Sequence, residues 1–528
     1  MRKVSVTQTT LLTARRILTG TGASANAVLV CDGRIAAVGD AADLRRQAPS
    51  AAHLDLAGTT LMPGLVDAHV HLTEWSLSRH QVDLAGTSTP GQAVRIAEAF
   101  SHPERGWIRG RGWSGHEWGG QEPHRGLLDQ AFPDRPVALQ SHDMHSLWVN
   151  SAALAAAGIT PDTPDPAGGS IVRDDRGDPT GLLLENAAQL VSDRIPPPTV
   201  AEAMAAITAG QTELHRLGFT GVHSFPPIHI SGPDTLSVLQ QLHERGELGL
   251  RVLQHIALDS LETMIAAGVR SGFGSEWIRI GAVKMFLDGA LGSRTAWMRT
   301  PYENSSSTGV SVMDRRTLRD VVMRAASAGI ACTVHAIGDA AVELAFQELC
   351  PEDRRVPAMP HRIEHVQCCP PELFAKFAAA RIVASVQPCH LMSDWGAADR
   401  HWGARARHTY AFRSLLDGGA TLAFGSDAPV EPIDPRRGLF AAVARRDDRH
   451  RPDGGWYASE CIGAAEALRA FTRGPAIAAG TERLQGTIQP GAWADITAWT
   501  EDPLEVEPER LPDIRCAATV VGGALVHS

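Results

Sequence analysis

LMPGLVDAHVHL, at residues 61–72, is the stretch of sequence that decides the fold. Pro63-Gly64 is a turn signal, and the apolar run after it carries His69 and His71 at alternating positions. Successive side chains of a β-strand point to opposite faces, so the two imidazoles share one face of a predicted strand. Two histidines on one rigid strand form half of a metal site, although an isolated H-x-H pair is more often structural.

The size and composition of the chain exclude several classes of protein. A chain of 528 residues, 20% of them charged, can bury a large core, and an α/β barrel with insertions can account for most of it. The net charge of −10 comes from 49 basic and 59 acidic residues, without a basic run or an RNA-binding motif. We therefore expect no nucleic-acid partner.

The N-terminal residues and the cysteines bear on the compartment. The start of the chain has no long apolar segment before a cleavage site, so we predict neither a signal peptide nor a membrane span. None of the eight cysteines forms a C-x-x-C pair, and the adjacent Cys368 and Cys369 are interpreted as buried thiols rather than a redox centre. This usage is typical of a reducing cytoplasm.

The two ends of the chain share one sequence pattern, in which short predicted strands are joined by glycine turns. Asp32-Gly33 separates two alternating runs, which is a strong hairpin signal. Similar strands return after residue 485. We predict that residues 1–62 and 485–528 pair into one small, β-sandwich-like domain.

A long irregular segment follows the first predicted barrel strand. Residues 73–200 contain helical pieces, many prolines and glycines, and several tryptophans, among them Trp113. A β/α unit needs only about 30 residues, so we interpret this segment as an insertion. In a barrel it would line the mouth of the active site, because the loops after the strands gather there. The alternative is a subdomain that packs its aromatic residues into a core of its own.

Apolar strands alternate with helical segments through the rest of the chain, which predicts a parallel sheet. Together with residues 61–72 there are eight such strands, so residues 63–484 are predicted to form a (β/α)₈ TIM barrel of α/β class. The other seven predicted strands cover residues 219–225, 250–256, 277–287, 331–335, 361–366, 381–387 and 421–427.

Six polar side chains stand on these strands, mostly near their carboxyl ends. In a barrel those ends converge on the face where active sites lie, so the six groups should surround one point. A single histidine at a strand end is usually structural, but four with an aspartate and a lysine indicate a metal site. The predicted ligands are His69, His71, Lys284, His335, His365 and Asp427.

The lysine is informative because only three of the 49 basic residues are lysines. Lys284 lies in an apolar predicted strand, where a lysine needs a reason that arginine cannot satisfy. Burial near cations lowers the pKa of a lysine and gives a neutral amine, whereas arginine stays protonated. Lys284 could therefore be a neutral amine, or alternatively a charged lysine that forms an ion pair with Asp288 or Asp427.

With these residues identified, the chain resembles the amidohydrolase superfamily of metal-dependent hydrolases over nearly its whole length. PGLVDAHVH resembles the strand-1 signature of that superfamily. A narrower resemblance, to the subgroup that contains N-substituted formamide deformylases, is carried by VKMFLDGALGSRTA, SVQPCH, GSDAPVEPIDP and GTIQPGAWAD. The resemblance also implies the β-domain built from both ends.

The resemblance assigns roles to the six predicted ligands. It implies that His69, His71, His335, His365 and Asp427 bind metal and that Lys284 forms a CO₂-derived carbamate between two metals. A site with a single metal ion remains the alternative. Imidazole and carboxylate ligands suit Zn²⁺, with Mn²⁺, Fe²⁺ or Ni²⁺ as alternatives.

The ligand set predicts a hydrolytic mechanism. Metal-activated hydroxide would attack a polarised carbonyl while Asp427 acts as general base and then passes the proton to the leaving nitrogen. We expect the substrate to be a small N-substituted, formamide-like amide. A cyclic amide, a carbamate or an ester could be hydrolysed at the same site, and a non-catalytic barrel scaffold is a remote alternative.

Further residues are candidates for binding the substrate, each with a structural alternative. His390 could hydrogen-bond the substrate carbonyl, and Arg294 could hold an anionic group or pair with Asp288. The full set is His390, Arg294, Asp288, Glu185, His145 and Trp113. The oligomeric state is not readable from the sequence, and a homodimer is our working guess.

Overall fold

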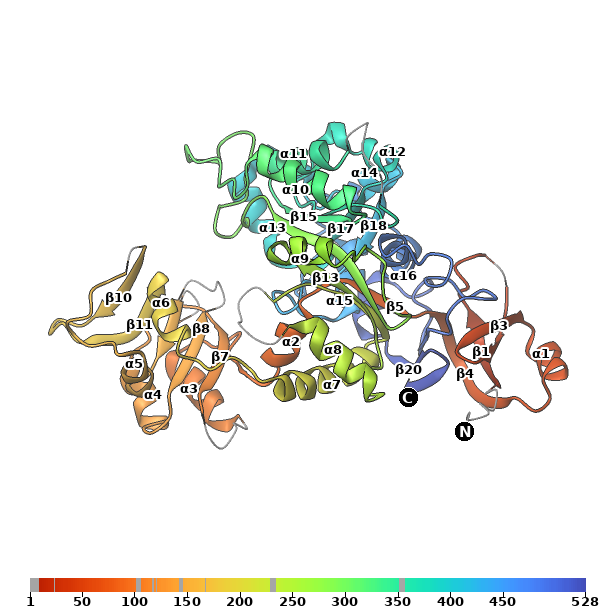
Figure 1. The fold of residues 1–528 in the computed structure, drawn as a ribbon, viewed down its shortest axis with the longest axis horizontal. Coiled ribbons are helices and arrows are strands. Elements are labelled where there is room, and N and C mark those ends of the chain that lie inside the picture. Colours follow the sequence, from red (N-terminus) through yellow and green to blue (C-terminus); the bar gives the residue numbers. More distant parts are fainter. Residues whose placement is uncertain are drawn as a thin grey trace. The chain divides into compact units, whose positions relative to one another are not determined.

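Eight parallel strands form the central sheet of the protein (Figure 1), in the order β18-β17-β16-β15-β14-β13-β12-β5. The computed structural model describes residues 9–22, 24–100, 106–115, 118–119, 121–141, 146–166, 168–227, 234–350 and 357–528. The strands are β5 (Leu65–Val70), β12 (Phe219–Ser224), β13 (Arg251–Ala257), β14 (Ile278–Phe286), β15 (Cys332–Ala336), β16 (Arg362–His365), β17 (Val383–Val386) and β18 (Thr421–Phe424).

The sheet closes between its first and last strands. A parallel bridge joins Val70, at the end of β5, to Ala428, just beyond β18. All six residues of β5 and all six of β12 are buried, as expected for strands that face the barrel interior on one side and helices on the other. The predicted (β/α)₈ barrel is therefore confirmed.

Helices follow the barrel strands along the chain. Most are amphipathic and bury one apolar side, as in α10, where Leu318, Val322 and Ala325 are buried. The helices are α7 (Val200–Arg216), α8 (Thr235–Glu244), α9 (Leu261–Ala266), α10 (Arg315–Ser327), α11 (Asp339–Leu349), α12 (Lys376–Ala380), α13 (Pro388–Trp402), α14 (Phe412–Asp417), α15 (Pro435–Ala444) and α16 (Ala464–Ala478). None of the helices in the described residues is both long and apolar enough to span a membrane.

The two ends of the chain share a second sheet, in the order β21-β20-β19-β4-β1-β2-β3. The antiparallel pairing of β19 with β4 joins the late strands to the early ones, with Ile496 opposite Pro63. The predicted pairing of the two ends is therefore present, and the division into a separate domain of residues 1–62 and 485–528 stays a prediction. Its elements are β1 (Thr9–Ile17), β2 (Ala27–Cys31), β3 (Arg34–Gly39), α1 (Ala41–Gln47), β4 (Ala52–Pro63), β19 (Ile496–Trp499), β20 (Cys516–Val521) and β21 (Ala524–His527).

The predicted hairpin at Asp32-Gly33 connects β2 to β3. Both turn residues have positive φ, 49° at Asp32 and 76° at Gly33. That combination is typical of a two-residue turn whose twist matches the flanking antiparallel strands. The turn therefore follows directly from the Asp-Gly pair in the sequence.

Residues 76–206 form a compact unit of their own around a six-stranded sheet, in the order β10-β11-β9-β8-β7-β6. Its strands are β6 (Val82–Asp83), β7 (Ile108–Trp113), β8 (Val137–Ser141), β9 (Ser146–Val149), β10 (Gly169–Arg173) and β11 (Pro179–Glu185). Its helices are α3 (Pro90–Ala99), α4 (Arg125–Ala131), α5 (Ser151–Ala157) and α6 (Asn186–Ser192), and α2 (Leu72–Ser78) leads into the unit. That this insertion lines the barrel mouth stays a prediction.

The tryptophans of the insertion form its own hydrophobic core. The rings of Trp113 and Trp118 stack with their centroids 4.9 Å apart, and Trp148 meets Trp118 edge-on. Trp113 is only 4% exposed, and its Nε1 donates to the carbonyl of Leu139. This burial favours the alternative in which Trp113 packs in the core of the insertion, and the substrate-binding role of Trp113 stays a prediction.

A buried ion pair joins the amino end of the barrel to the sheet made by the chain ends. The Arg251 guanidinium, at the start of β13, donates to both carboxylate oxygens of Asp495 over 2.5 and 3.0 Å. It lies over the rings of Trp493, at 4.1 Å, and Trp277, at 4.8 Å. Aromatic rings and a carboxylate thus surround one buried cation.

Removing one member of this pair should destabilise the protein. Arg251→Met leaves the Asp495 carboxylate buried without its counter-ion, and we expect a loss of about 3–5 kcal/mol in the free energy of unfolding. The double variant Arg251→Met/Asp495→Leu should recover much of this loss because no charge is left buried. Guanidinium chloride titration measures both, and an unchanged midpoint for the single variant would contradict the prediction.

The cysteines allow a second prediction, because their exposure differs strongly. Burial raises the pKa of Cys368 to about 12 and the pKa of Cys369 well above its usual value, whereas Cys350 is exposed. At pH 8 a pKa of about 12 leaves roughly one thiol in ten thousand as the reactive thiolate. Iodoacetamide should therefore label Cys350 in the native protein and reach Cys368 and Cys369 only after unfolding. Peptide mass spectrometry reads this out, and rapid native labelling of the adjacent pair would refute it.

Candidate metal centre

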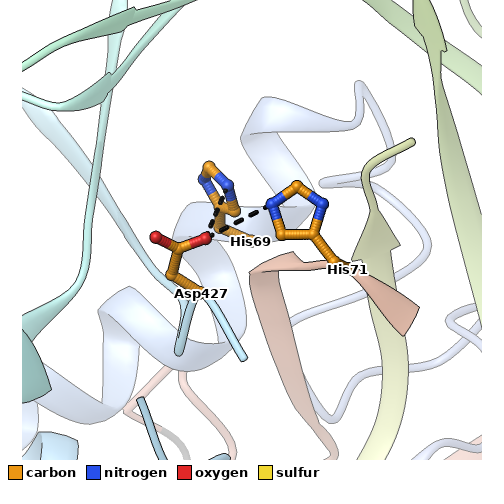
Figure 2. A group of neighbouring side chains, drawn as sticks. All are labelled: His69, His71 and Asp427. Atoms are coloured by element: carbon orange, nitrogen blue, oxygen red, sulfur yellow. Dashed lines mark ion pairs between the residues drawn. The ribbon is translucent and has the colours of Figure 1, made fainter. Parts of the chain in front are cut away.

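His69, His71 and Asp427 meet at the carboxyl end of the barrel (Figure 2). One nitrogen or oxygen from each lies within 4.8 Å of the others, and all three residues are buried. The Nε2 atoms of His69 and His71 lie 3.2 and 3.5 Å from Oδ1 of Asp427. The histidines come from β5 and the residue after it, while Asp427 follows β18, so barrel closure brings the three together.

The other ring nitrogen of each histidine is already bonded. Nδ1 of His69 lies 2.7 Å from Oε2 of Glu364, and Nδ1 of His71 lies 2.7 Å from the carbonyl of Pro226. An oxygen acceptor at Nδ1 places the proton on that nitrogen. The lone pair of Nε2 is then directed toward the shared space beside Asp427, as a metal ligand requires.

His335 and His365 extend this group of imidazoles. The His365 ring centroid lies 4.5 Å from that of His335 and 5.2 Å from that of His69. Nε2 of His335 donates to the carbonyl of Gly289 over 3.1 Å, which leaves Nδ1 as the ligand atom. Burial lowers the pKa of His335 to about 3 and that of His365 well below its usual value. Both rings are therefore neutral and able to bind a cation.

Lys284, on β14, lies between two aromatic rings. Its Nζ is 4.7 Å from the ring centroids of both Phe225 and Phe286, and burial lowers the pKa of Lys284 to about 8. Within the described residues no ion pair of Lys284 with Asp288 or Asp427 is formed. Asp288 instead accepts hydrogen bonds from the backbone N–H groups of Trp297, Ile337 and Gly338.

Strained backbone brings two of these side chains to the site. His365 has φ 71°, the Val366 after it has φ 44°, and Asp427 has φ 61°. Positive φ is unusual for residues other than glycine and is a genuine outlier for a β-branched valine. Glu364 and His365 are neighbours on β16 and would normally point to opposite faces. The left-handed turn lets both approach the same centre, His365 directly and Glu364 through His69.

Comparison with known proteins shows the family of the chain that carries this site. Residues 53–527 match the model described as the amidohydrolase family. The chain belongs to the amidohydrolase family. Residues 27–51 also match an imidazolonepropionase-like composite domain of bacteria, within the sheet formed by the chain ends.

Relatives of this amidohydrolase cover almost its whole length. YtcJ of Bacillus subtilis (strain 168), which is named as an amidohydrolase without a substrate, is 33% identical over 96% of both chains. The N-substituted formamide deformylase of Arthrobacter pascens is 28% identical over 95% of this chain and 94% of its own. The crystal structure of an uncharacterized metal-dependent hydrolase from Pyrococcus horikoshii OT3 superimposes with a TM-score of 0.81 at 26% identity, covering 95% of this chain and 99% of that one. The protein is accordingly a metal-dependent hydrolase.

The donor set of this amidohydrolase fits a divalent metal. Neutral imidazoles and one carboxylate are the ligands that zinc prefers in catalytic sites. Partners at the other ring nitrogens of His69, His71 and His335 orient the rings, which is the usual arrangement around bound metal. His69, His71 and Asp427 therefore lie where a cation could be held, and the ligand roles of His335, His365 and Lys284 stay predictions.

The remaining predicted residues lie in different places. His390, the third residue of α13, has Nε2 3.5 Å from Oδ2 of Asp427. Burial alone would lower the pKa of His390, but the Asp427 carboxylate outweighs it and raises that pKa to about 9. Arg294 is exposed, and Asp288 is bound by backbone groups rather than by Arg294.

Two other predicted residues belong to the insertion. Glu185 is an exposed residue at the N-cap of α6, within the separate unit of residues 76–206. His145 lies outside the described residues. Their predicted roles in substrate binding stay predictions.

Sequence reasoning missed three buried residues that support the ligands. Oδ1 of Asp67 accepts hydrogen bonds from the backbone N–H groups of His69, at 2.9 Å, and Ser426, at 3.0 Å. Asp67 thereby ties β5 to the turn that carries Asp427. Phe225 stacks on the His69 ring at 3.9 Å, and Glu364 holds its Nδ1. The signal that could have found Asp67 and Glu364 is a carboxylate inside an otherwise buried strand, one or two residues before a predicted ligand.

Asp67 can be tested by comparing two substitutions. Asp67→Ala leaves two buried N–H groups without an acceptor, each at a cost of about 1–3 kcal/mol, and should lower both the unfolding midpoint and the bound metal. Burial raises the pKa of Asp67 to about 6, and Asp67→Asn keeps an acceptor oxygen, so it should lose much less. Unfolding curves and metal content by plasma mass spectrometry check both variants. Equal behaviour of the alanine and asparagine variants would count against the role.

Proposed function

We propose that this amidohydrolase cleaves a non-peptide C–N bond, and that its substrate is a small N-substituted amide of the formamide type. The observation that carries the proposal is the convergence of ligand atoms from His69, His71 and Asp427, with His335 and His365 beside them. The formamide substrate class is supported by the relative named N-substituted formamide deformylase, which is 28% identical over 95% of this chain.

We assign the metal ligands as the four histidines, Asp427 and Lys284, with zinc as the cation. When bound, a divalent metal lowers the pKa of a water molecule to about 7 and polarises a substrate carbonyl. The Lys284 amine, which burial makes easier to deprotonate, is suited to reaction with CO₂ to give a carbamate. A carbamate would add a second anionic ligand and so favour two cations over one.

Asp427 divides its two oxygens between two tasks. Oδ1 faces Nε2 of His69 and His71, while Oδ2 faces Nε2 of His390. We assign Oδ2 as the atom that takes the proton of the attacking water and returns it to the leaving nitrogen. His390, on the same side, can donate a hydrogen bond to the substrate carbonyl as negative charge develops on its oxygen.

The assignment of the base predicts the behaviour of Asp427→Asn. The amide cannot accept a proton as a carboxylate does, so kcat should fall by about 10²–10⁴-fold. The histidines remain, so metal should still bind. Amine release measured together with metal content checks this, and Asp417→Asn, a surface change at a carboxylate 65% exposed, serves as the matched control.

Retained turnover in Asp427→Asn would refute the assigned base. A panel of formamides, longer acyl amides, cyclic amides, carbamates and esters then separates the substrate classes, because the ligand set is the same for all of them. Preference for a cyclic amide, a carbamate or an ester would replace the formamide proposal. A purified protein that takes up no transition metal on reconstitution would favour a binding scaffold instead.

A further inference from the structure

A buried ion pair lies inside the barrel next to the candidate metal centre. Arg362 and Glu364 are two residues apart on β16, so their side chains share its inward face. Nε of Arg362 lies 2.6 Å from Oε1 of Glu364, and both side chains are 0% exposed. Barrel interiors are usually filled by branched apolar side chains, so two opposite charges at this position need an explanation.

Glu364 uses both of its oxygens. Oε2 accepts from Nδ1 of His69 over 2.7 Å, and Oε1 accepts from the hydroxyl of Thr333 as well as from Arg362. The carboxylate thus has one fixed orientation, and in that orientation it holds a predicted metal ligand. His71 differs, because a backbone carbonyl, that of Pro226, occupies its Nδ1.

Arg362 is fixed in turn by partners on four other strands, β5, β12, β13 and β17. Its Nη2 donates to the carbonyl of Ala68 on β5 and to Oγ of Ser385 on β17, each over 2.6 Å. Its Nη1 lies 2.9 Å from Nδ1 of His223 on β12. Burial and the Arg362 charge lower the pKa of His223 well below its usual value, so that ring is neutral. Glu364 is therefore the counter-charge that Arg362 directly contacts.

Stability alone does not account for the pair. Taking two charges out of water is expensive, and well-packed apolar residues of similar volume are often as stable or more stable at such positions. A carboxylate behind a metal-binding imidazole, in contrast, fixes the ring and makes its other nitrogen a better ligand. Phe225, stacked at 3.9 Å, restrains the ring of His69 from its face.

We propose that Glu364, held in place by Arg362, is a positioning residue that fixes the orientation and tautomer of His69 for binding metal. The inference rests on the proposed function, since it assumes that His69 is a ligand. It assigns the Arg362–Glu364 pair to ligand geometry rather than to folding.

The test is the affinity of the full-length protein for Co²⁺ and Zn²⁺, measured by chelator competition. Glu364→Gln should weaken metal binding by about 10–100-fold and change the visible absorption of the Co²⁺ form. The matched control is Asp495→Asn, in the buried pair with Arg251 at the other end of the barrel strands. The control should lower the unfolding midpoint and leave metal affinity unchanged.

Should Glu364→Gln fail to fold, Thr333→Val provides a milder perturbation. It removes only the hydroxyl that donates to Oε1 of Glu364, and a smaller loss of metal affinity in the same direction would support the proposal. Wild-type affinity in either folded variant would overturn it, as would an equal loss of affinity in Asp495→Asn. If the wild-type protein itself bound no metal, the proposed function would fail first, and the assignment of Glu364 with it.

Discussion

The seam between β5 and β18 is the constraint on which the site depends. The backbone N–H of Asp427 donates to the carbonyl of His69 over 2.7 Å, and that of His71 donates to Ala428 over 2.9 Å. Asp67 adds a side-chain bond to the same turn. These bonds close the barrel and set the distance between the H-x-H pair and the aspartate. Fold and site are therefore products of the same few interactions.

Burial around this seam keeps the imidazoles of His335 and His365 neutral. Burial lowers the pKa of His335 to about 3, and it also makes the Lys284 amine easier to deprotonate. Glu364, in contrast, stays charged. Burial alone would raise the pKa of its carboxyl, but Arg362 and His69 hold that pKa well below its usual value. The barrel interior thus holds a fixed anion, Glu364, behind His69 and neutral imidazoles at His335 and His365.

Backbone strain is concentrated where strands end and ligands begin. His365, Val366 and Asp427 all have positive φ, a conformation that costs about 1–3 kcal/mol for each such residue. Such conformations persist only where the surrounding structure compensates for them, here through barrel closure and buried hydrogen bonds. The strain turns side chains from a regular strand toward a common centre, which a strand of ideal geometry would not do.

Much of the architecture was readable from the sequence because it depends on local chemistry. Alternation around His69 and His71, the rare Lys284 in an apolar run and the Asp32-Gly33 turn each report a local preference of the chain. Eight strands in β/α order then imply convergence of their carboxyl ends. The predicted ligands follow from that convergence, and the structure brings His69, His71 and Asp427 together, with the rings of His335 and His365 nearby.

Other features were decided only by tertiary packing. From the sequence alone, Trp113 fits a pocket wall and a hydrophobic core equally well. Its burial against Trp118 depends on how the insertion folds. Glu364 looks like any carboxylate beside a histidine until β5, far away in sequence, brings His69 to one of its oxygens, while Arg362 of its own strand holds the other. Periodicity reports which face of a strand a residue occupies, but not which partners from other strands meet it there.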